Sequence, residues 1–196
     1  MRLVAYLKTT AEMQLKGSLA PEDLQDLVLD VYPDADWNGD SATTKSTNGL
    51  FVELRGKSGR CWPLTWASKK QTCTSSSTCE AETIALSHGL RSEGIPLQGV
   101  LEEMLGVKVR TCCQVDNTQA IAAVERGYSK KLRHLQRTHR ISIGVMHECI
   151  TDPEMAITVK YCPTKEHKGD AFTKQLGTRQ FAIGRSMMGM MDPKCE

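Results

Sequence analysis

The sequence lacks several features that would assign it to a protein class at once. Its longest apolar runs are too short to cross a membrane, and the apolar start of the chain is too short for a signal peptide. Neither a low-complexity segment nor an internal repeat is visible in the 196 residues. We therefore expect one intracellular domain, cytoplasmic or nuclear, without a membrane partner.

Strong net charge and paired cysteines are also missing. The formal net charge is only +2, so affinity for nucleic acid would have to come from local clusters of Lys and Arg. The eight cysteines form no C-x-x-C pair, and most of them lie in apolar segments where a free thiol packs as a small hydrophobe. Reduced thiols in a reducing compartment are expected, and a structural zinc or redox protein is the least favoured class.

The stretch LVLDVYPDADWNGD is the strongest local signal in the chain. Its apolar, β-branched part from Leu27 to Tyr32 predicts a buried strand. Asp34, Asp36 and Asp40 follow directly. Because the carboxyl ends of strands in α/β sheets open onto the crevice where ligands bind, this stretch predicts a metal site. The alternative is an Asp-rich turn after an ordinary strand.

The remaining strand patterns predict a sheet with mixed strand directions. Residues 48–56 and 60–70 predict two strands joined by a turn at 56–59, so the first three strands should form an antiparallel meander. Residues 107–116 predict a strand that is followed at once by a short helix. Such a crossover unit makes this strand parallel to the first one, which puts their carboxyl ends at the same edge.

The main helix is expected to start in SSSTCEAETIAL. Ser77 and Glu80 fit a capping box, which gives Glu80 a structural role. Glu82 begins a stripe with Ala85 and Leu86 at helical spacing, which directs its carboxylate toward the sheet. A buried carboxylate needs a partner, and a cation is a natural one. The alternative is a solvated glutamate in the first turn, favoured by the helix dipole.

Two further aspartates follow later in the chain. Asp116 ends the fourth predicted strand, although an aspartate in this position often only caps the next helix. Asp170 lies in or near the first turn of a helix expected in KEHKGDAFTKQL. Each aspartate alone is a weak signal, but both lie next to predicted element ends.

The segment RGYSKKLRHLQRTHR is basic and contains no acidic residue. Tyr128 and Leu132 interleave with its charges, which favours an ordered surface that binds phosphates. The alternative is a solvated run of charges.

Seven stretches in this chain order resemble the ribonuclease H domain of copia-type LTR retrotransposons: YPDADWNGD, KSTNG, PLTWASKKQ, SSSTCEAETIAL, VDNTQAI, QRTHRISI and GDAFTKQL. The resemblance implies an α/β fold of the ribonuclease H-like class, a five-stranded mixed sheet flanked by helices. It also implies a tether helix over 1–24, a ribonuclease H-like domain over 25–178 and a C-terminal amphipathic tail over 179–196. In that family the tether joins the domain to reverse transcriptase, so a reverse transcriptase domain in a longer polyprotein is an expected partner.

The activity that the resemblance implies is metal-dependent hydrolysis of the RNA strand of RNA–DNA hybrids. Two Mg²⁺ ions would serve this endonuclease chemistry, with Mn²⁺ as a substitute. The family's catalytic and metal-binding carboxylates fall on Asp34, Glu82, Asp116 and Asp170. Asp34 is preferred to Asp36 because the family places a small residue, here Ala35, after the catalytic aspartate, so Asp36 is an auxiliary candidate.

Several polar residues near these acids are candidates for binding the hybrid. Contacts to its 2′-hydroxyls and phosphates are expected from Asn117, Ser76, Lys130, Lys131, Arg133 and Arg137. His167 is a further auxiliary candidate that would assist metal or product exchange, with an exposed loop histidine as the alternative. The sequence indicates no oligomeric state.

One residue departs from the family pattern in an important place. Pro33 precedes Asp34 where the family usually has serine, and proline cannot donate a ladder hydrogen bond in a central strand. Either the strand ends at Tyr32 or the site is distorted. The alternative function is therefore a non-catalytic nucleic-acid-binding or assembly module that keeps the fold.

Overall fold

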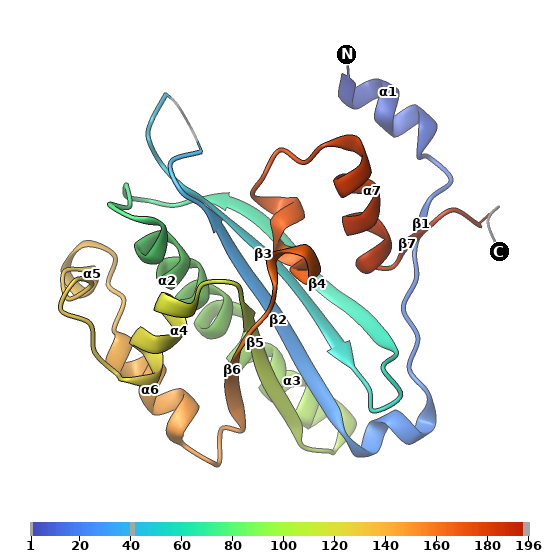
Figure 1. The fold of residues 1–196 in the computed structure, drawn as a ribbon. Helices are drawn as coiled ribbons and strands as arrows, with labels where there is room; N and C mark the ends of the chain where they lie inside the picture. Colours follow the sequence, from blue (N-terminus) through green and yellow to red (C-terminus); the bar gives the residue numbers. More distant parts are fainter. Residues whose placement is uncertain (1, 40–41, 194–196) are drawn as a thin grey trace.

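A five-stranded sheet in the order β4-β3-β2-β5-β6 lies at the centre of the computed structural model, which describes residues 2–39 and 42–193 (Figure 1). Its strands are β2 (Leu27–Asp36), β3 (Thr47–Arg55), β4 (Cys61–Lys70), β5 (Val109–Val115) and β6 (Ile157–Tyr161). Strands β2, β3 and β4 are antiparallel neighbours, whereas β5 is parallel to both β2 and β6. The predicted α/β class, with a five-stranded mixed sheet flanked by helices, is confirmed. Asp40 and Cys195 lie outside the described residues.

Helices and short turns connect and cover these strands. The α-helices are α1 (Arg2–Thr9), α2 (Thr78–His88), α3 (Ile95–Leu105), α4 (Thr118–Glu125), α5 (Leu135–Thr138), α6 (Ile143–Thr151) and α7 (Thr178–Met187). The shorter elements are the 3₁₀ turns η1 (Pro21–Gln25), η3 (Thr164–Glu166) and η4 (Lys168–Phe172), the π-helical turn η2 (Gly89–Gly94), and the paired strands β1 (Gln14–Leu15) and β7 (Met190–Met191). Among the described residues, no helix combines the length and the apolar character needed to cross a membrane.

The two faces of the sheet bury different sets of side chains. Along β2, Leu27, Leu29 and Val31 point into the large core formed with α2, α4 and α6. Tyr32 points to the other face, where it packs with Phe51 against η4. The alternation follows from the two-residue period of a strand. Figure 1 shows η4 lying over β2 and β3, so this turn is held close to the carboxyl end of β2.

Small residues allow α2 to approach β2 closely. Ala35 on β2 forms a small cluster with Ala81 and Ala85 on α2. At the end of α2, a Cβ on Gly89 would lie only 3.1 Å from the Cβ of Pro33. The predicted buried stripe beginning at Glu82 is confirmed, because every member of it is buried.

Of the two alternatives for Pro33, the one in which the strand ends at Tyr32 is wrong, because β2 continues to Asp36. Pairing between β2 and β5 extends only to Val31 and Cys113, so the last part of β2 is paired with β3 alone. A proline is tolerated where one side of a strand has no partner.

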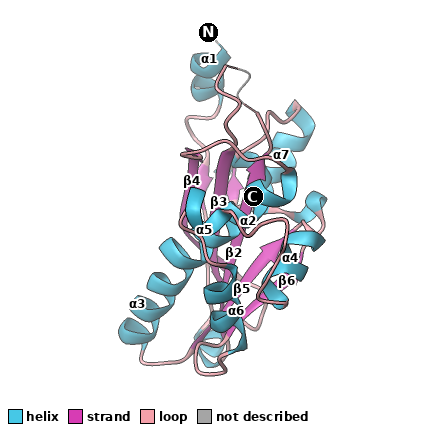
Figure 2. Ribbon diagram, turned by 90° about the vertical axis from the view of Figure 1, so that its left-hand side faces the viewer, coloured by secondary structure: helices cyan, strands magenta, loops and turns pink. Residues whose placement is uncertain are grey.

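Helices α2 and α3 are joined without a break, because the chain continues from α2 through η2 into α3 although Gly94 and Pro96 lie in this stretch. The N-terminal helix α1 covers only Arg2–Thr9 of the tether predicted over 1–24. It lies apart from the sheet, beside α7 (Figure 1, Figure 2), where the ring of Tyr6 packs on the ring of Phe181 with 5.6 Å between the ring centroids. The boundaries of the tether and the tail stay a prediction.

Candidate metal centre

Two groups of metal-ligating side chains meet at Asp34. In the first group, oxygens of Asp34, Glu82 and Asp116 all lie within 4.8 Å of one another. In the second group, ligand atoms of Asp34, His167 and Asp170 also all lie within 4.8 Å of one another. The structure thus brings together the four acidic residues singled out in the sequence, from β2, α2, η4 and the end of β5.

Glu82 is the least satisfied of these carboxylates. Its residue is 4% exposed, and its Oε2 atom has no hydrogen-bond partner among the described residues. Burial raises the pKa of Glu82 to about 9, and the nearby charges of Asp34 and Asp116 add to this effect. The solvated first-turn glutamate is therefore wrong. Without a cation, this carboxyl group holds its proton at neutral pH.

Lys174 places a positive charge next to Asp34 and Asp170. Its Nζ atom lies 2.8 Å from Asp170 Oδ1 and 3.4 Å from Asp34 Oδ1. Burial alone would lower the pKa of Lys174, but Asp34 and Asp170 outweigh it and raise the pKa. Thr173 donates its hydroxyl to Asp34 Oδ2. Lys174 was not predicted from the sequence, although its four-residue spacing from Asp170 is typical of an ion pair on one helical face.

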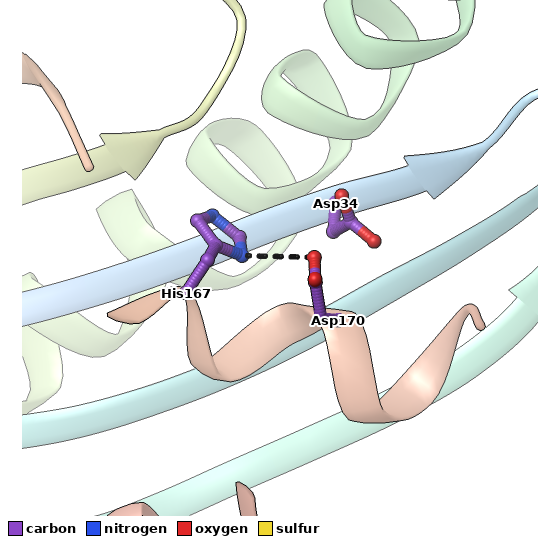
Figure 3. Close-up of side chains that lie close together, drawn as sticks. All are labelled: Asp34, His167 and Asp170. Carbon is purple, nitrogen blue, oxygen red and sulfur yellow. Dashed lines mark ion pairs between the residues drawn. The ribbon is translucent and has the colours of Figure 1, made fainter. Parts of the chain in front are cut away.

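His167 is buried, so the exposed loop histidine is wrong. Its side chain is 0% exposed, and Nε2 lies 2.8 Å from the carbonyl oxygen of Gln114. Its Nδ1 atom has no hydrogen-bond partner in the described part of the chain and lies 3.9 Å from Asp170 Oδ1. Figure 3 shows His167 and Asp170 directed toward each other, with Asp34 beside them.

Close approach of η4 depends on two glycines. A Cβ on Gly169 would lie 2.7 Å from the carbonyl oxygen of Tyr32 and 3.0 Å from Asp34 Cβ. A Cβ on Gly49, opposite Asp34 on β3, would lie 2.5 Å from Thr173 Cγ2. Larger residues at these positions would push η4, and with it His167, away from β2.

The surroundings of Asp116 and Asp36 differ in a way that separates their roles. Asp116 accepts a hydrogen bond from Thr164 Oγ1 at 3.0 Å, and Asn117 is the residue that caps α4. The helix-cap alternative for Asp116 is therefore wrong. Asp36 accepts a hydrogen bond from the backbone of Thr47 and belongs to neither metal-ligating group.

Asn117 and Ser76 already take part in hydrogen bonds at helix starts. The side-chain oxygen of Asn117 accepts the backbone N–H groups of the second and third residues after it, both at 3.0 Å. Ser77 caps α2 by accepting the backbone N–H of Glu80 at 3.2 Å. The Glu80 carboxylate accepts the N–H of Ser76 at 3.0 Å, one residue earlier than a capping box requires.

Glu80 also connects α2 to the basic segment 126–140. Its Oε1 atom lies 3.1 Å from His134 Nε2 and 3.7 Å from His139 Nε2. Within the segment, Leu132 and Leu135 are buried in the core. These contacts show that the segment is an ordered surface.

Most cations of the basic segment point to solvent, and one lines a cavity beside the acids. Lys130, Arg133 and Arg137 are exposed. Lys131 lines a cavity of about 650 Å³ together with Asp116 and Asn117. The cysteines that the structure describes are free thiols, and none of them joins the two metal-ligating groups.

Two of the sequence relatives found by comparison with known proteins are of different kinds, and no protein-family model matches the chain. The retrovirus-related Pol polyprotein from transposon TNT 1-94 of Nicotiana tabacum is 29% identical over 191 residues, which is 96% of this chain and 13% of that polyprotein. The secreted RxLR effector protein 161 of Plasmopara viticola is 36% identical over 86 residues, which is 44% of this chain and 54% of that protein. The first match confirms the predicted likeness to a retrotransposon polyprotein over nearly the whole chain, and the copia type stays a prediction.

Among solved structures, LC11-RNase H1 in complex with an RNA/DNA hybrid is similar in fold. The alignment covers 76% of this chain and 94% of that chain, with 14% identity and a TM-score of 0.49.

Proposed function

We propose that this chain is a copia-type ribonuclease H domain that hydrolyses the RNA strand of RNA–DNA hybrids. The observation that carries the proposal is the buried side chain of Glu82, whose Oε2 atom has no hydrogen-bond partner in the described residues and which offers a carboxylate oxygen close to those of Asp34 and Asp116. A buried carboxylate in such a place is costly unless a cation binds it. The sequence likeness to a retrotransposon Pol polyprotein supports the same assignment.

The donor set fits two divalent ions that share Asp34. Its oxygens belong to both metal-ligating groups, and the group with Glu82 and Asp116 offers only carboxylate oxygens. Hard cations such as Mg²⁺ prefer such oxygens, and Mn²⁺ accepts the same ligands and can replace it. When bound, two such ions supply positive charge to the attacking and the leaving oxygens of a phosphodiester.

The residues of the chain hold these oxygens in place. Asp34 is fully buried on a strand and fixed by Thr173, and Asp116 is oriented by the hydroxyl of Thr164. Glu82 lies in a low-dielectric pocket that strengthens its attraction to a cation. A preorganised site of this kind needs little rearrangement when the ions and the phosphate arrive.

Substrate contacts follow from the cavity beside Asp116. Asn117 and Lys131 line this cavity and are proposed to contact the RNA strand and its phosphates. Ser76, Lys130, Arg133 and Arg137 are proposed to hold the hybrid nearby, with the basic side chains on phosphates of the DNA strand.

We also propose a polyprotein context for the domain. A reverse transcriptase domain would precede the tether over 1–24, which leads into the nuclease domain over 25–178 and the tail over 179–196. Such a polyprotein would act in the cytoplasm or the nucleus, where hybrids form.

A second candidate function is a non-catalytic nucleic-acid-binding or assembly module. The observation that favours it is Lys174, because its ammonium already neutralises part of the charge of Asp34 and Asp170. In this module the basic segment would bind a hybrid, but the four acidic residues would not support hydrolysis of its RNA strand.

The test compares labelled RNA–DNA hybrid, duplex DNA and single-stranded RNA. In Mg²⁺ the chain should cut the RNA of the hybrid, leave duplex DNA intact, and lose activity on chelation with EDTA. Binding of the hybrid is measured in Ca²⁺. Salt-dependent binding without any cleavage in Mg²⁺ or Mn²⁺ would favour the module instead.

A further inference from the structure

His167 is oriented as metal-ligating histidines are. Its Nε2 atom lies 2.8 Å from the carbonyl oxygen of Gln114, which can only accept, so Nε2 carries a proton. In the neutral ring, Nδ1 then has a lone pair free for a ligand. A hydrogen bond from the second ring nitrogen to a backbone carbonyl is the usual way in which proteins fix a metal-bound imidazole.

Protein groups do not satisfy the Nδ1 atom of His167. The side chain is 0% exposed, and Nδ1 has no hydrogen-bond partner among the described residues. Asp170 Oδ1 is 3.9 Å away, which is too long for a hydrogen bond even if the ring were doubly protonated. The edge of the ring packs on Tyr32 at 5.7 Å between ring centroids, so neighbouring atoms hold its orientation. A lone pair facing carboxylate oxygens is unfavourable unless a cation lies between them.

We propose that Asp34, His167 and Asp170 form a nitrogen-containing cation site that prefers a transition-metal ion such as Mn²⁺ to Mg²⁺. The preference follows from ligand type, because an imidazole nitrogen binds first-row transition-metal ions, among which Mn²⁺ binds most weakly, whereas Mg²⁺ prefers oxygen ligands and water. The three ligand atoms already lie within 4.8 Å of one another (Figure 3). The inference rests on the proposed function in one respect, since Asp34 also serves the oxygen-only group.

Lys174 controls access to this site. Its ammonium bridges Asp170 and Asp34 at 2.8 and 3.4 Å, so an entering ion must displace it. The side chain is 34% exposed and has a path to solvent. Removing the ammonium should therefore tighten ion binding at the nitrogen-containing site.

The test measures Mn²⁺ binding by calorimetry and the nitrogen coupling of bound Mn²⁺ by pulsed electron paramagnetic resonance. Wild-type protein loaded with Mn²⁺ should show a ¹⁴N coupling from a directly bound imidazole. His167→Asn should abolish this coupling and weaken Mn²⁺ binding at that site by about tenfold or more. Lys174→Met should keep the coupling and raise the affinity severalfold, and His88→Asn, remote on α2, should match wild type.

Two results would overturn the inference. One is wild-type protein with both sites filled by Mn²⁺ and no ¹⁴N coupling, and the other is a coupling that persists in His167→Asn. If His167→Asn fails to fold, the wild-type spectrum and the affinity of Lys174→Met still decide. Hybrid cleavage in Mg²⁺ is assayed in parallel: cleavage without nitrogen coupling would reject this site and leave the proposed function standing, whereas coupling without cleavage would support the site and count against the nuclease.

Discussion

Asp34 and Asp36 are two residues apart on β2, and their surroundings differ sharply. Asp34 is fully buried and shared by both metal-ligating groups, whereas Asp36 binds the backbone of Thr47 outside them. Asp34→Asn should therefore lower Mg²⁺-dependent cleavage of a hybrid by several orders of magnitude, because it removes a charge that both ions need. Cleavage rates of purified variants at saturating Mg²⁺ measure the effect.

Asp36→Asn is the matched control, since it makes the same chemical change on the same strand. Its cleavage rate should stay within a few-fold of wild type. Equal losses in the two variants would mean that Asp34 has no special role. Circular dichroism of both proteins checks that the fold is retained.

Glu82 makes the stability of the metal-free protein depend on pH. Its pKa is raised by burial to about 9, above the ordinary value of 4.5 for the unfolded chain. The folded state therefore binds a proton that the unfolded state has lost. The stabilisation from protonated Glu82 is complete below about pH 4.5 and disappears as the pH rises through about 9.

Urea unfolding in EDTA at several pH values tests this expectation. Between pH 5 and 9, the free energy of unfolding of wild type should fall relative to Glu82→Gln, with a slope of at most about 1.4 kcal/mol per pH unit. Mg²⁺ should oppose the decline, because it binds the ionised carboxylate. Parallel curves for the two proteins in EDTA would show that Glu82 ionises normally.

At the scale of elements, a buried ion pair fixes η4 to the sheet. Lys168 Nζ binds Glu53 Oε1 on β3, and the side chains are 13% and 2% exposed. Tyr32 adds a hydrogen bond to the same carboxylate at 3.3 Å. Because η4 begins with Lys168 and carries Asp170, this pair positions half of the candidate metal centre.

Lys168→Met should destabilise the protein by about 3–5 kcal/mol, since it leaves the charge of Glu53 buried without its partner. The double variant Glu53→Gln with Lys168→Met should recover a large part of this loss. Urea denaturation of both single variants and the double variant gives the coupling free energy. Additive losses would show that the two side chains do not depend on each other.

Elements with a clear sequence period were predictable, and contacts between distant elements were not. The strand from Leu27, the start of α2 at Ser77 and the parallel partner ending before Asp116 follow from local patterns. The continuation of β2 past Pro33 depends on where β5 diverges, which no local pattern encodes. The burial of His167 arises in the same way, because it depends on how η4 packs on β2.

At the scale of the whole molecule, the local clustering of charged residues matters more for nucleic-acid binding than the net charge. The net charge is only +2, yet the basic segment 126–140 reaches the candidate metal centre, because Lys131 and Asp116 line the same cavity. The logarithm of the hybrid affinity should therefore fall linearly with the logarithm of the salt concentration, with a slope of about 0.7 to 0.9 per phosphate contact.

Replacing Lys130 and Lys131 with alanine should remove phosphate contacts and lower the slope of this salt dependence by about one to two. Binding is measured in Ca²⁺ by titrating a labelled hybrid at several salt concentrations. The control replaces Lys57 and Lys108, which lie in the β3–β4 turn and before β5, at the opposite end of the sheet. An unchanged slope in the first variant would make the segment an ordinary solvated surface.

The carboxylates around Asp34 are proposed to serve cleavage of RNA, and not of DNA, in a duplex with a DNA strand. The most direct measurement uses an end-labelled strand of DNA with a central run of ribonucleotides, annealed to complementary DNA and incubated in Mg²⁺. Cuts should fall only within the ribonucleotides and should disappear in EDTA and in Asp34→Asn. Equal cutting of the flanking deoxynucleotides, or undiminished cutting by Asp34→Asn, would contradict the account.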